Sequence, residues 1–214
     1  MILSPTRRLV LAAALAPFAA QAAPAPAAAL GPQDQALVDR AVAYLQDMGE
    51  VRARFIQSDG RGAPTQGTVF LKRPGKARFA YDPPSGLLVV SNGATVSVAD
   101  SRLKTFDAYP LMATPLSLFL AKTVRLDKGV VVTRVARQAD GFSITARDGK
   151  RQTAGEITLT FKDAPLALQA WSVTDAQGRA VHLQLVGLER VSGLAPSLFE
   201  LKDPRPANPG RAKM

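Results

Sequence analysis

The first patterned segment of the chain has the period of a helix. Between Gln33 and Met48, apolar side chains recur three and four positions apart, and charged or amide side chains occupy the positions between them. This spacing predicts an amphipathic helix with one apolar face. Gly49 follows at the point where the pattern stops, as is common at the C-terminal end of a helix. Such a helix needs a second apolar surface on which to lie.

After Gly49 the period of the apolar residues changes from 3.6 to 2, which is typical of β-strands with one buried face. Turn signals separate the alternating stretches at short intervals. Asn92-Gly93 is the strongest, because both residues tolerate the positive φ of a type I′ hairpin turn. We expect about ten or eleven strands in an antiparallel meander. The clearest alternation covers residues 51–55, 68–72, 76–81, 94–98, 130–137, 142–147, 156–162, 167–174 and 179–188.

One segment between the strands carries helix signals. Thr114 can cap a helix N-terminus, Pro115 suits the first helical position, and apolar residues follow as far as Ala121. A large antiparallel sheet curls, and its concave face needs cover from the two helical segments. The pattern therefore predicts a mainly β fold with a few helices, namely an incomplete, half-open antiparallel β-barrel covered by a helical lid over an apolar cavity. A fully packed β-sandwich is the alternative that composition leaves open.

The two ends of the chain differ from the middle in composition. Arg7 and Arg8 precede a short apolar run, and Ala20-Gln21-Ala22 is a small-x-small sequence, so we expect a cleaved secretory signal peptide. The arginine pair also fits the twin-arginine pattern, which leaves the export route open. The expected organisation is a signal peptide at 1–22, an Ala/Pro-rich spacer at 23–32, one domain at 33–202 and a Pro-rich basic tail at 203–214.

The composition excludes several kinds of chemistry. The 214 residues include no Cys and one His, so the chain has no thiol nucleophile, no Cys-ligated metal and no paired-histidine zinc motif. No G-x-S-x-G sequence occurs, and His182 alternates with the apolar residues of a strand, which is typical of an ordinary strand histidine. We therefore expect no catalytic residue, no metal site and no cofactor. A hydrolase with a site not visible in the sequence is the alternative from another functional class.

The chain is basic, with a formal charge of +10. Removal of residues 1–22 would leave 25 basic and 17 acidic side chains, a formal charge of +8. Export and the low aromatic content, 6% of residues, argue against nucleic acid as a partner. Anionic membrane surfaces or acidic protein surfaces fit this charge better. The absence of Cys also means that the mature chain cannot itself be acylated as a bacterial lipoprotein.

One stretch of sequence resembles a known family. The run KRPGKARFAYDPP covers Lys72 to Pro84, with Phe55-Ile56-Gln57 before it and Ser91-Asn92-Gly93 after it. In this order the segments resemble the outer-membrane lipoprotein carrier (LolA) family, whose pattern is F-x-Q, a Gly-led strand, R-P-G-K-x-R-x-x-Y-x-x-P and a V-S-D/N-G hairpin. The resemblance extends to the helix at 115–120 and to Phe199, and covers about residues 37 to 201.

The resemblance implies a soluble, monomeric periplasmic carrier that is not an enzyme. Members of this family accept acylated lipoproteins from an inner-membrane ABC transporter, shield the acyl chains in a hydrophobic cavity, and pass them to an outer-membrane lipoprotein receptor. In the family, the arginine of the R-P loop, here Arg73 beside Pro74, bonds to the helical lid and holds it shut when the cavity is empty. A periplasmic binding or sensor protein for another lipid or glycolipid on the same fold is the alternative.

Two positions depart from the family pattern. Ala77 stands where many members carry an aromatic residue, and the strand at 95–99 lacks the aromatics often found after the hairpin. Both changes reduce apolar bulk near the cavity mouth, so we expect cargo preference or grip to differ. Alternation alone leaves open which strand faces point inward. The candidate lining residues are Phe55, Val69, Leu71, Phe79, Tyr81, Leu88, Val90, Leu116, Phe119, Trp171, Leu183 and Leu185.

Overall fold

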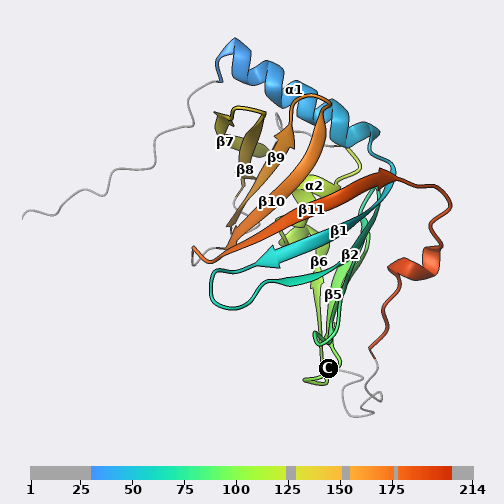
Figure 1. The fold of residues 1–214 in the computed structure, drawn as a ribbon. Helices are drawn as coiled ribbons and strands as arrows, with labels where there is room; N and C mark the ends of the chain where they lie inside the picture. Colours follow the sequence, from blue (N-terminus) through green and yellow to red (C-terminus); the bar gives the residue numbers. More distant parts are fainter. Residues whose placement is uncertain (1–29, 124–128, 151–154, 176–177, 204–214) are drawn as a thin grey trace, which may run out of the picture.

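The computed structural model describes residues 30–123, 129–150, 155–175 and 178–203 (Figure 1). The expected signal peptide, most of the spacer and the tail after Asp203 lie outside these residues. The helical elements are α1 (Pro32–Asp47), η1 (Leu111–Ala113), α2 (Leu116–Leu120) and η2 (Pro196–Phe199). The strands are β1 (Glu50–Ser58), β2 (Thr65–Lys72), β3 (Lys76–Tyr81), β4 (Leu87–Asn92), β5 (Thr95–Asp100), β6 (Thr105–Pro110), β7 (Val130–Arg137), β8 (Gly141–Asp148), β9 (Gly155–Lys162), β10 (Ala167–Asp175) and β11 (Ala180–Arg190).

All of these strands form one antiparallel sheet of 11 strands, in the order β6-β5-β4-β3-β2-β1-β11-β10-β9-β8-β7. Sequence neighbours pair except β6 and β7, and the first and last strands, β1 and β11, pair with each other in the middle of the sheet. Within the described residues the edge strands β6 and β7 do not pair with each other, so the sheet curls without closing. Figure 1 shows α1 lying across the β7–β10 half and α2 within the curve of the sheet. The half-open barrel with a helical lid is confirmed.

The first helix covers one half of the concave face. Its apolar stripe, Val38, Ala41 and Leu45, is fully buried. Tyr44, on the same side, meets Phe161 of β9 edge to face, with ring centroids 5.9 Å apart. At the rim, Arg40 pairs with Asp163, their side-chain atoms 2.5 Å apart. The helix thus supplies the second apolar surface that the sheet requires. None of the described helices is both long and apolar enough to cross a membrane.

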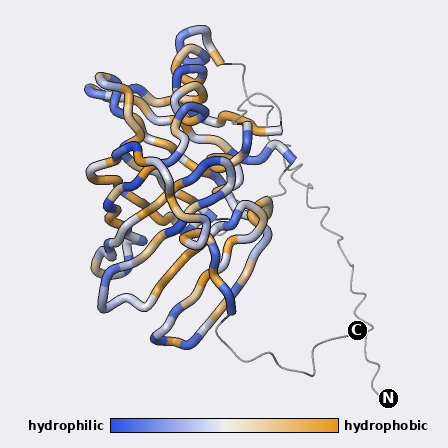
Figure 2. Tube along the Cα trace, turned by 90° about the vertical axis from the view of Figure 1, so that its right-hand side faces the viewer, coloured by the Kyte–Doolittle hydropathy of each residue, from blue (hydrophilic) through white to orange (hydrophobic). Residues whose placement is uncertain are grey.

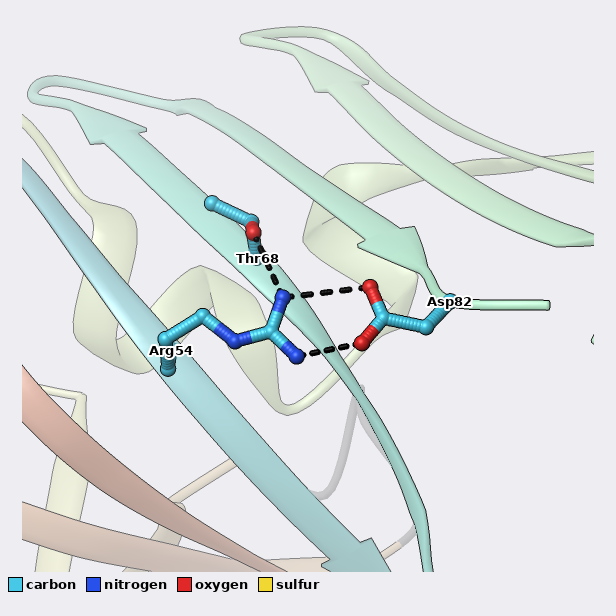
Figure 3. Close-up of polar contacts among 3 residues, drawn as sticks. All are labelled: Arg54, Thr68 and Asp82. Atoms are coloured by element: carbon cyan, nitrogen blue, oxygen red, sulfur yellow. Dashed lines mark hydrogen bonds and ion pairs between the residues drawn. The ribbon is translucent and has the colours of Figure 1, made fainter.

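The two faces of the sheet differ in polarity, and Figure 2 shows hydrophobic and hydrophilic residues alternating along the strands. Phe55, Val69 and Leu71 are buried on the concave face. On the convex face, Arg54 of β1 donates to Thr68 on β2 at 3.0 Å and forms a two-pronged ion pair with Asp82, just after β3 (Figure 3). The bond from Arg54 lowers the pKa of the Asp82 carboxyl. This cluster ties three consecutive segments together on the solvent side.

The structure departs from the sequence expectations in two local details. Asn92 does not take the positive φ that a type I′ turn requires; only Gly93 does, at 104°, and the Asn92 carbonyl Oδ1 accepts bonds from the backbone N–H groups of Ala94 and Thr95. The Thr114 hydroxyl donates to the Leu111 carbonyl and caps no helix, so α2 begins only at Leu116. In both cases the short polar side chain finds a backbone partner other than the expected one.

Two strands, β4 and β6, fall outside the ranges of clear alternation, and the edge strand β6 shows one reason. Almost all of its residues are exposed, because it pairs only with β5 and projects from the body of the sheet. A strand without a buried face is under no constraint to alternate apolar and polar residues. The other predicted strand ranges fall within the observed strands to within a residue or two.

We expect the Phe161→Ala substitution to lower the free energy of unfolding by about 3–5 kcal/mol, because it deletes a buried ring. Phe161 stacks on Phe142 with centroids 5.3 Å apart and also holds α1 through Tyr44. Urea denaturation followed by circular dichroism measures the change. Lys162→Ala, at the exposed next position, is the control and should change the value by less than about 0.5 kcal/mol. A loss below about 1 kcal/mol for Phe161→Ala would contradict this account of the core.

Candidate functional site: an apolar pocket under a latched lid

An apolar pocket of about 260 Å³ lies between the concave face of the sheet and the beginning of the lid segment η1–α2. Most of its walls are aliphatic or aromatic. Val181, 36% exposed, lies at its mouth. The lining residues are Gln57, Phe79, Tyr81, Val89, Thr114, Pro115, Leu116, Trp171, Val173, Val181 and Leu183.

Strand register brings the lining residues together from distant parts of the chain. Phe79 of β3 pairs with Val89 of β4, and Trp171 of β10 pairs with Leu183 of β11. Residues paired in this way share one face of the sheet, so both pairs face inward. The Phe79 and Trp171 rings then meet edge to face, with centroids 6.0 Å apart, across the intervening strands. Phe119 of α2 lies 5.5 Å from Trp171, so that one indole contacts both the sheet and the lid.

The lid is held at its C-terminal end by the loop between β2 and β3. The two guanidinium Nη atoms of Arg73 donate to the carbonyls of Phe119 and Ala121, each at 2.7 Å. The backbone N–H of Gly75 donates to the Leu120 carbonyl at 2.8 Å. The last carbonyls of a helix have no partner within the helix. Three consecutive carbonyls at the end of α2 are therefore satisfied from this loop, and we call these bonds the latch.

Gly75 can be replaced by no other residue without strain. Its φ of +77° is the left-handed conformation that side chains disfavour, and a Cβ added there would lie 2.7 Å from the Cα of Gly93. The Ser91 hydroxyl, fully buried, donates to the Gly75 carbonyl at 2.6 Å. The tight β2–β3 loop is thus braced against the β4–β5 hairpin. The R-P-G sequence signalled Gly75, but neither its approach to Gly93 nor the role of Ser91 was predicted.

The Arg73 guanidinium bonds to backbone carbonyls rather than to a carboxylate. It is half-buried, and burial lowers the pKa of its guanidinium. Among the described residues no carboxylate pairs with it. Carbonyls at a helix C-terminus carry partial negative charge, which suits a cation. The latch therefore contains no buried ion pair among the described residues.

Tyr81 and Gln57 place a hydrogen bond at the wall of the pocket. The Tyr81 hydroxyl donates to Gln57 Oε1 at 2.7 Å. Burial is the main cause that raises the pKa of Tyr81 to about 12, against a smaller opposing effect of this bond. Tyr81 also packs edge to face on Phe55 at 4.9 Å. Gln57 was part of the F-x-Q sequence but was not among the candidate site residues.

The structure brings five of the sequence candidates to the pocket wall. They are Phe79, Tyr81, Leu116, Trp171 and Leu183.

A second group of candidates lies in the packed core beside the pocket, on the same concave side. They are Phe55, Val69, Leu71, Phe119 and Leu185. Pro74 is exposed in the latch loop, next to Arg73.

Two candidates lie on the other face of the sheet. Val90 pairs with Arg78 and Leu88 with Ala80, so both alternate with the inward residue Val89. Val90 is nevertheless buried. On its face, the Arg78 guanidinium donates to the Leu198 carbonyl of η2, which lies beside β3 and β4. The nearly continuous apolar run of β4 concealed which of its residues point inward.

Two observations concern the polar side chains outside the pocket. His182 is exposed and its Nδ1 bonds to the Ser172 hydroxyl at 2.7 Å. Across the part of the chain that the structure describes, no three His, Asp or Glu side chains are grouped so as to hold a metal ion.

Comparisons of the sequence with a family model and with curated proteins find the same family. A family model described as "Outer membrane lipoprotein carrier protein LolA" matches residues 47–202. An outer-membrane lipoprotein carrier protein of Methylobacillus flagellatus is 28% identical over 80% of this chain and 87% of its own length. One from Chromobacterium violaceum is 25% identical over 95% and 96%. Among solved structures, an uncharacterized conserved protein of Thermus thermophilus aligns with a TM-score of 0.48 and 13% identity, covering 80% of this chain and 96% of that one.

We expect Gly75→Ala to destabilise the fold by about 1–3 kcal/mol more than a glycine substitution that introduces only backbone strain. Gly60→Ala is the matched control, because Gly60 has a similar φ of +73° but no atom within 4 Å of the position that a Cβ would take. The control should cost about 1–2 kcal/mol. Thermal or urea unfolding of both variants measures the difference. Equal losses would show that the close approach to Gly93 does not constrain the latch loop.

Proposed function

The chain belongs to the outer-membrane lipoprotein carrier (LolA) family, and on that premise we propose that it is a periplasmic carrier that shields the acyl chains of lipoproteins and ferries them from the inner to the outer membrane. The observation that carries the proposal is the apolar pocket between the curled sheet and a latched lid. An apolar space beside a latched cover suits a cargo whose acyl chains must be kept from water.

The size of the pocket indicates that the described form is the closed one. Its volume of about 260 Å³ is below the roughly 300–1,000 Å³ of pockets that enclose drug-sized ligands. Acyl chains of a lipoprotein therefore require the lid to move. The latch is the first contact that such a movement breaks, because it joins the end of α2 to the sheet.

Lid opening also makes tight binding reversible. Burying a sixteen-carbon chain would contribute about 12 kcal/mol at roughly 0.8 kcal/mol per methylene, and several such chains would hold too tightly for a carrier. Opening exposes Phe119 and Leu120, which are fully buried in the closed form. Each costs about 1.5–3 kcal/mol to expose. This cost offsets part of the binding energy, and closure of the lid recovers it when the cargo leaves.

The donor and acceptor of the cargo follow from the same proposal. The carrier would take acylated lipoproteins from an inner-membrane ABC lipoprotein-releasing transporter, act as a monomer, and deliver to an outer-membrane lipoprotein receptor. The basic balance of the chain supports acidic surfaces on these partners.

We expect triacylated peptides in lipid extracts of the protein purified from its native source, and mass spectrometry identifies them. A single other lipid class would instead indicate the binding or sensor protein considered above. Depletion of the protein should strand outer-membrane lipoproteins in the inner membrane, as fractionation would show. Normal sorting, or the absence of bound lipid together with no displacement of a fluorescent apolar probe, would overturn the carrier proposal.

We expect Arg73→Leu to speed the entry of a fluorescent apolar probe at least tenfold, because the variant keeps apolar bulk and loses both guanidinium bonds of the latch. The rate at which cargo passes to the receptor should also change, because loss of the latch shifts the balance between cargo retention and release. Stopped-flow fluorescence measures probe entry. Arg134→Leu, an exposed arginine of β7, is the control and should leave entry unchanged. Unchanged probe entry and handover in Arg73→Leu would refute the lid role.

A further inference from the structure

A second, polar hollow adjoins the apolar pocket. It has a volume of about 390 Å³ and lies where the β1–β2 loop faces the segment after β3. Its walls differ in character from those of the apolar pocket, with charged and hydroxyl side chains in place of most of the aliphatic ones. The lining residues are Gln57, Asp59, Arg61, Gly62, Ala63, Thr65, Tyr81, Ser85 and Leu87.

Gln57 and Tyr81 are the two residues that line both spaces. Gln57 lies near the end of β1 and Tyr81 is the last residue of β3, so the pair lies where the strands end and the loops begin. Their side chains join through the 2.7 Å bond from the Tyr81 hydroxyl to Gln57 Oε1. The pair therefore forms the boundary between an apolar compartment and a polar one.

The boundary pair retains donor capacity. A glutamine amide has one acceptor oxygen and two N–H donors. The oxygen of Gln57 accepts from Tyr81, whereas its amide nitrogen bonds to no side chain or carbonyl in the described parts of the chain. The bond from Tyr81 thus orients the amide so that the oxygen is occupied and the N–H groups remain to donate. The carbonyl oxygen of an ester or amide is a strong acceptor for such N–H groups.

The charged side chains of the hollow indicate what kind of polar group suits this space. The Asp59 carboxylate accepts a bond from the Arg61 backbone N–H at 3.0 Å, and this bond is the main cause that lowers its pKa. A carboxylate and a guanidinium thus line the same space. Together they suit a neutral, hydrogen-bonding head better than a lone anionic one.

We propose that Gln57 and Tyr81 form a recognition site for the ester or amide carbonyl that joins an acyl chain to its polar head. The chain lies in the apolar pocket, and the neutral polar head lies in the hollow lined by Asp59, Arg61 and Ser85. The Gln57 amide N–H donates to the carbonyl and sets how deeply the chain enters. This site deepens the carrier function proposed above, on which it rests, and makes the protein selective for acylated molecules over other apolar ones.

Two amphiphiles that differ at the carbonyl test the site: N-(2-hydroxyethyl)dodecanamide, which has an amide carbonyl, and 2-(dodecyloxy)ethanol, which has none. Affinities come from calorimetry on the full chain. The unsubstituted protein should bind the amide about fivefold more tightly, as one hydrogen bond implies. Gln57→Leu should weaken amide binding about fivefold and change ether binding less than twofold. Tyr81→Phe, which keeps the ring and removes the bond that orients the amide, should reduce the preference in part.

Gln184→Leu is the matched control, since Gln184 is exposed on β11 and adjoins neither pocket. It should leave both affinities unchanged. An equal affinity for the two amphiphiles in the unsubstituted protein would overturn the recognition site and leave the carrier proposal standing. Equal weakening of both by Gln57→Leu would likewise overturn it, because that result indicates a structural role alone. If neither amphiphile binds, the apolar pocket is not a lipid site and both proposals fall.

Discussion

The position of α2 depends on the latch, in which Arg73 and Gly75 satisfy the last two carbonyls of α2 and that of Ala121, which follows it. A five-residue helix is too short to be stable by itself, so its position comes from tertiary contacts. The latch supplies polar ones at one end, and Phe119 on Trp171 supplies an apolar one. The sheet needs this cover because its 11 strands curl without closing, which would otherwise leave an apolar concave face in water.

The contacts that hold α2 differ in kind from those that hold α1. Beneath α1, the rings of Phe142, Phe161 and Tyr44 pack together on the β8–β9 part of the sheet. The cover α2 packs on Trp171 of β10 and is attached to the β2–β3 loop through neutral carbonyls rather than through a buried ion pair. Breaking a buried ion pair would leave an unpaired charge at high cost. The latch thus holds α2 without a buried ion pair on a core that is one continuous cluster, with residues of both helices and of both halves of the sheet.

Much of the fold could be predicted from alternation, because a half-buried sheet imposes a period of 2 on each strand. Arg73 and Trp171 could be named as site candidates for their family pattern and their apolar bulk. Val89 could not, since four consecutive apolar residues in β4 carry no sign of which ones face inward. Gln57 was visible in the sequence, but its importance comes from Tyr81, whose hydroxyl reaches it across the intervening strand β2.

By itself the sequence determined that this protein is mainly β, with many short antiparallel strands, tight turns between them and two helical segments. These properties depend on local periodicity and turn chemistry, which neighbouring residues encode. Only the tertiary structure decided which strand faces point inward, that the latch reaches three consecutive carbonyls, and that an apolar and a polar space meet at Gln57 and Tyr81. Those features depend on strand register and curvature, which join residues far apart in the chain and leave no local pattern.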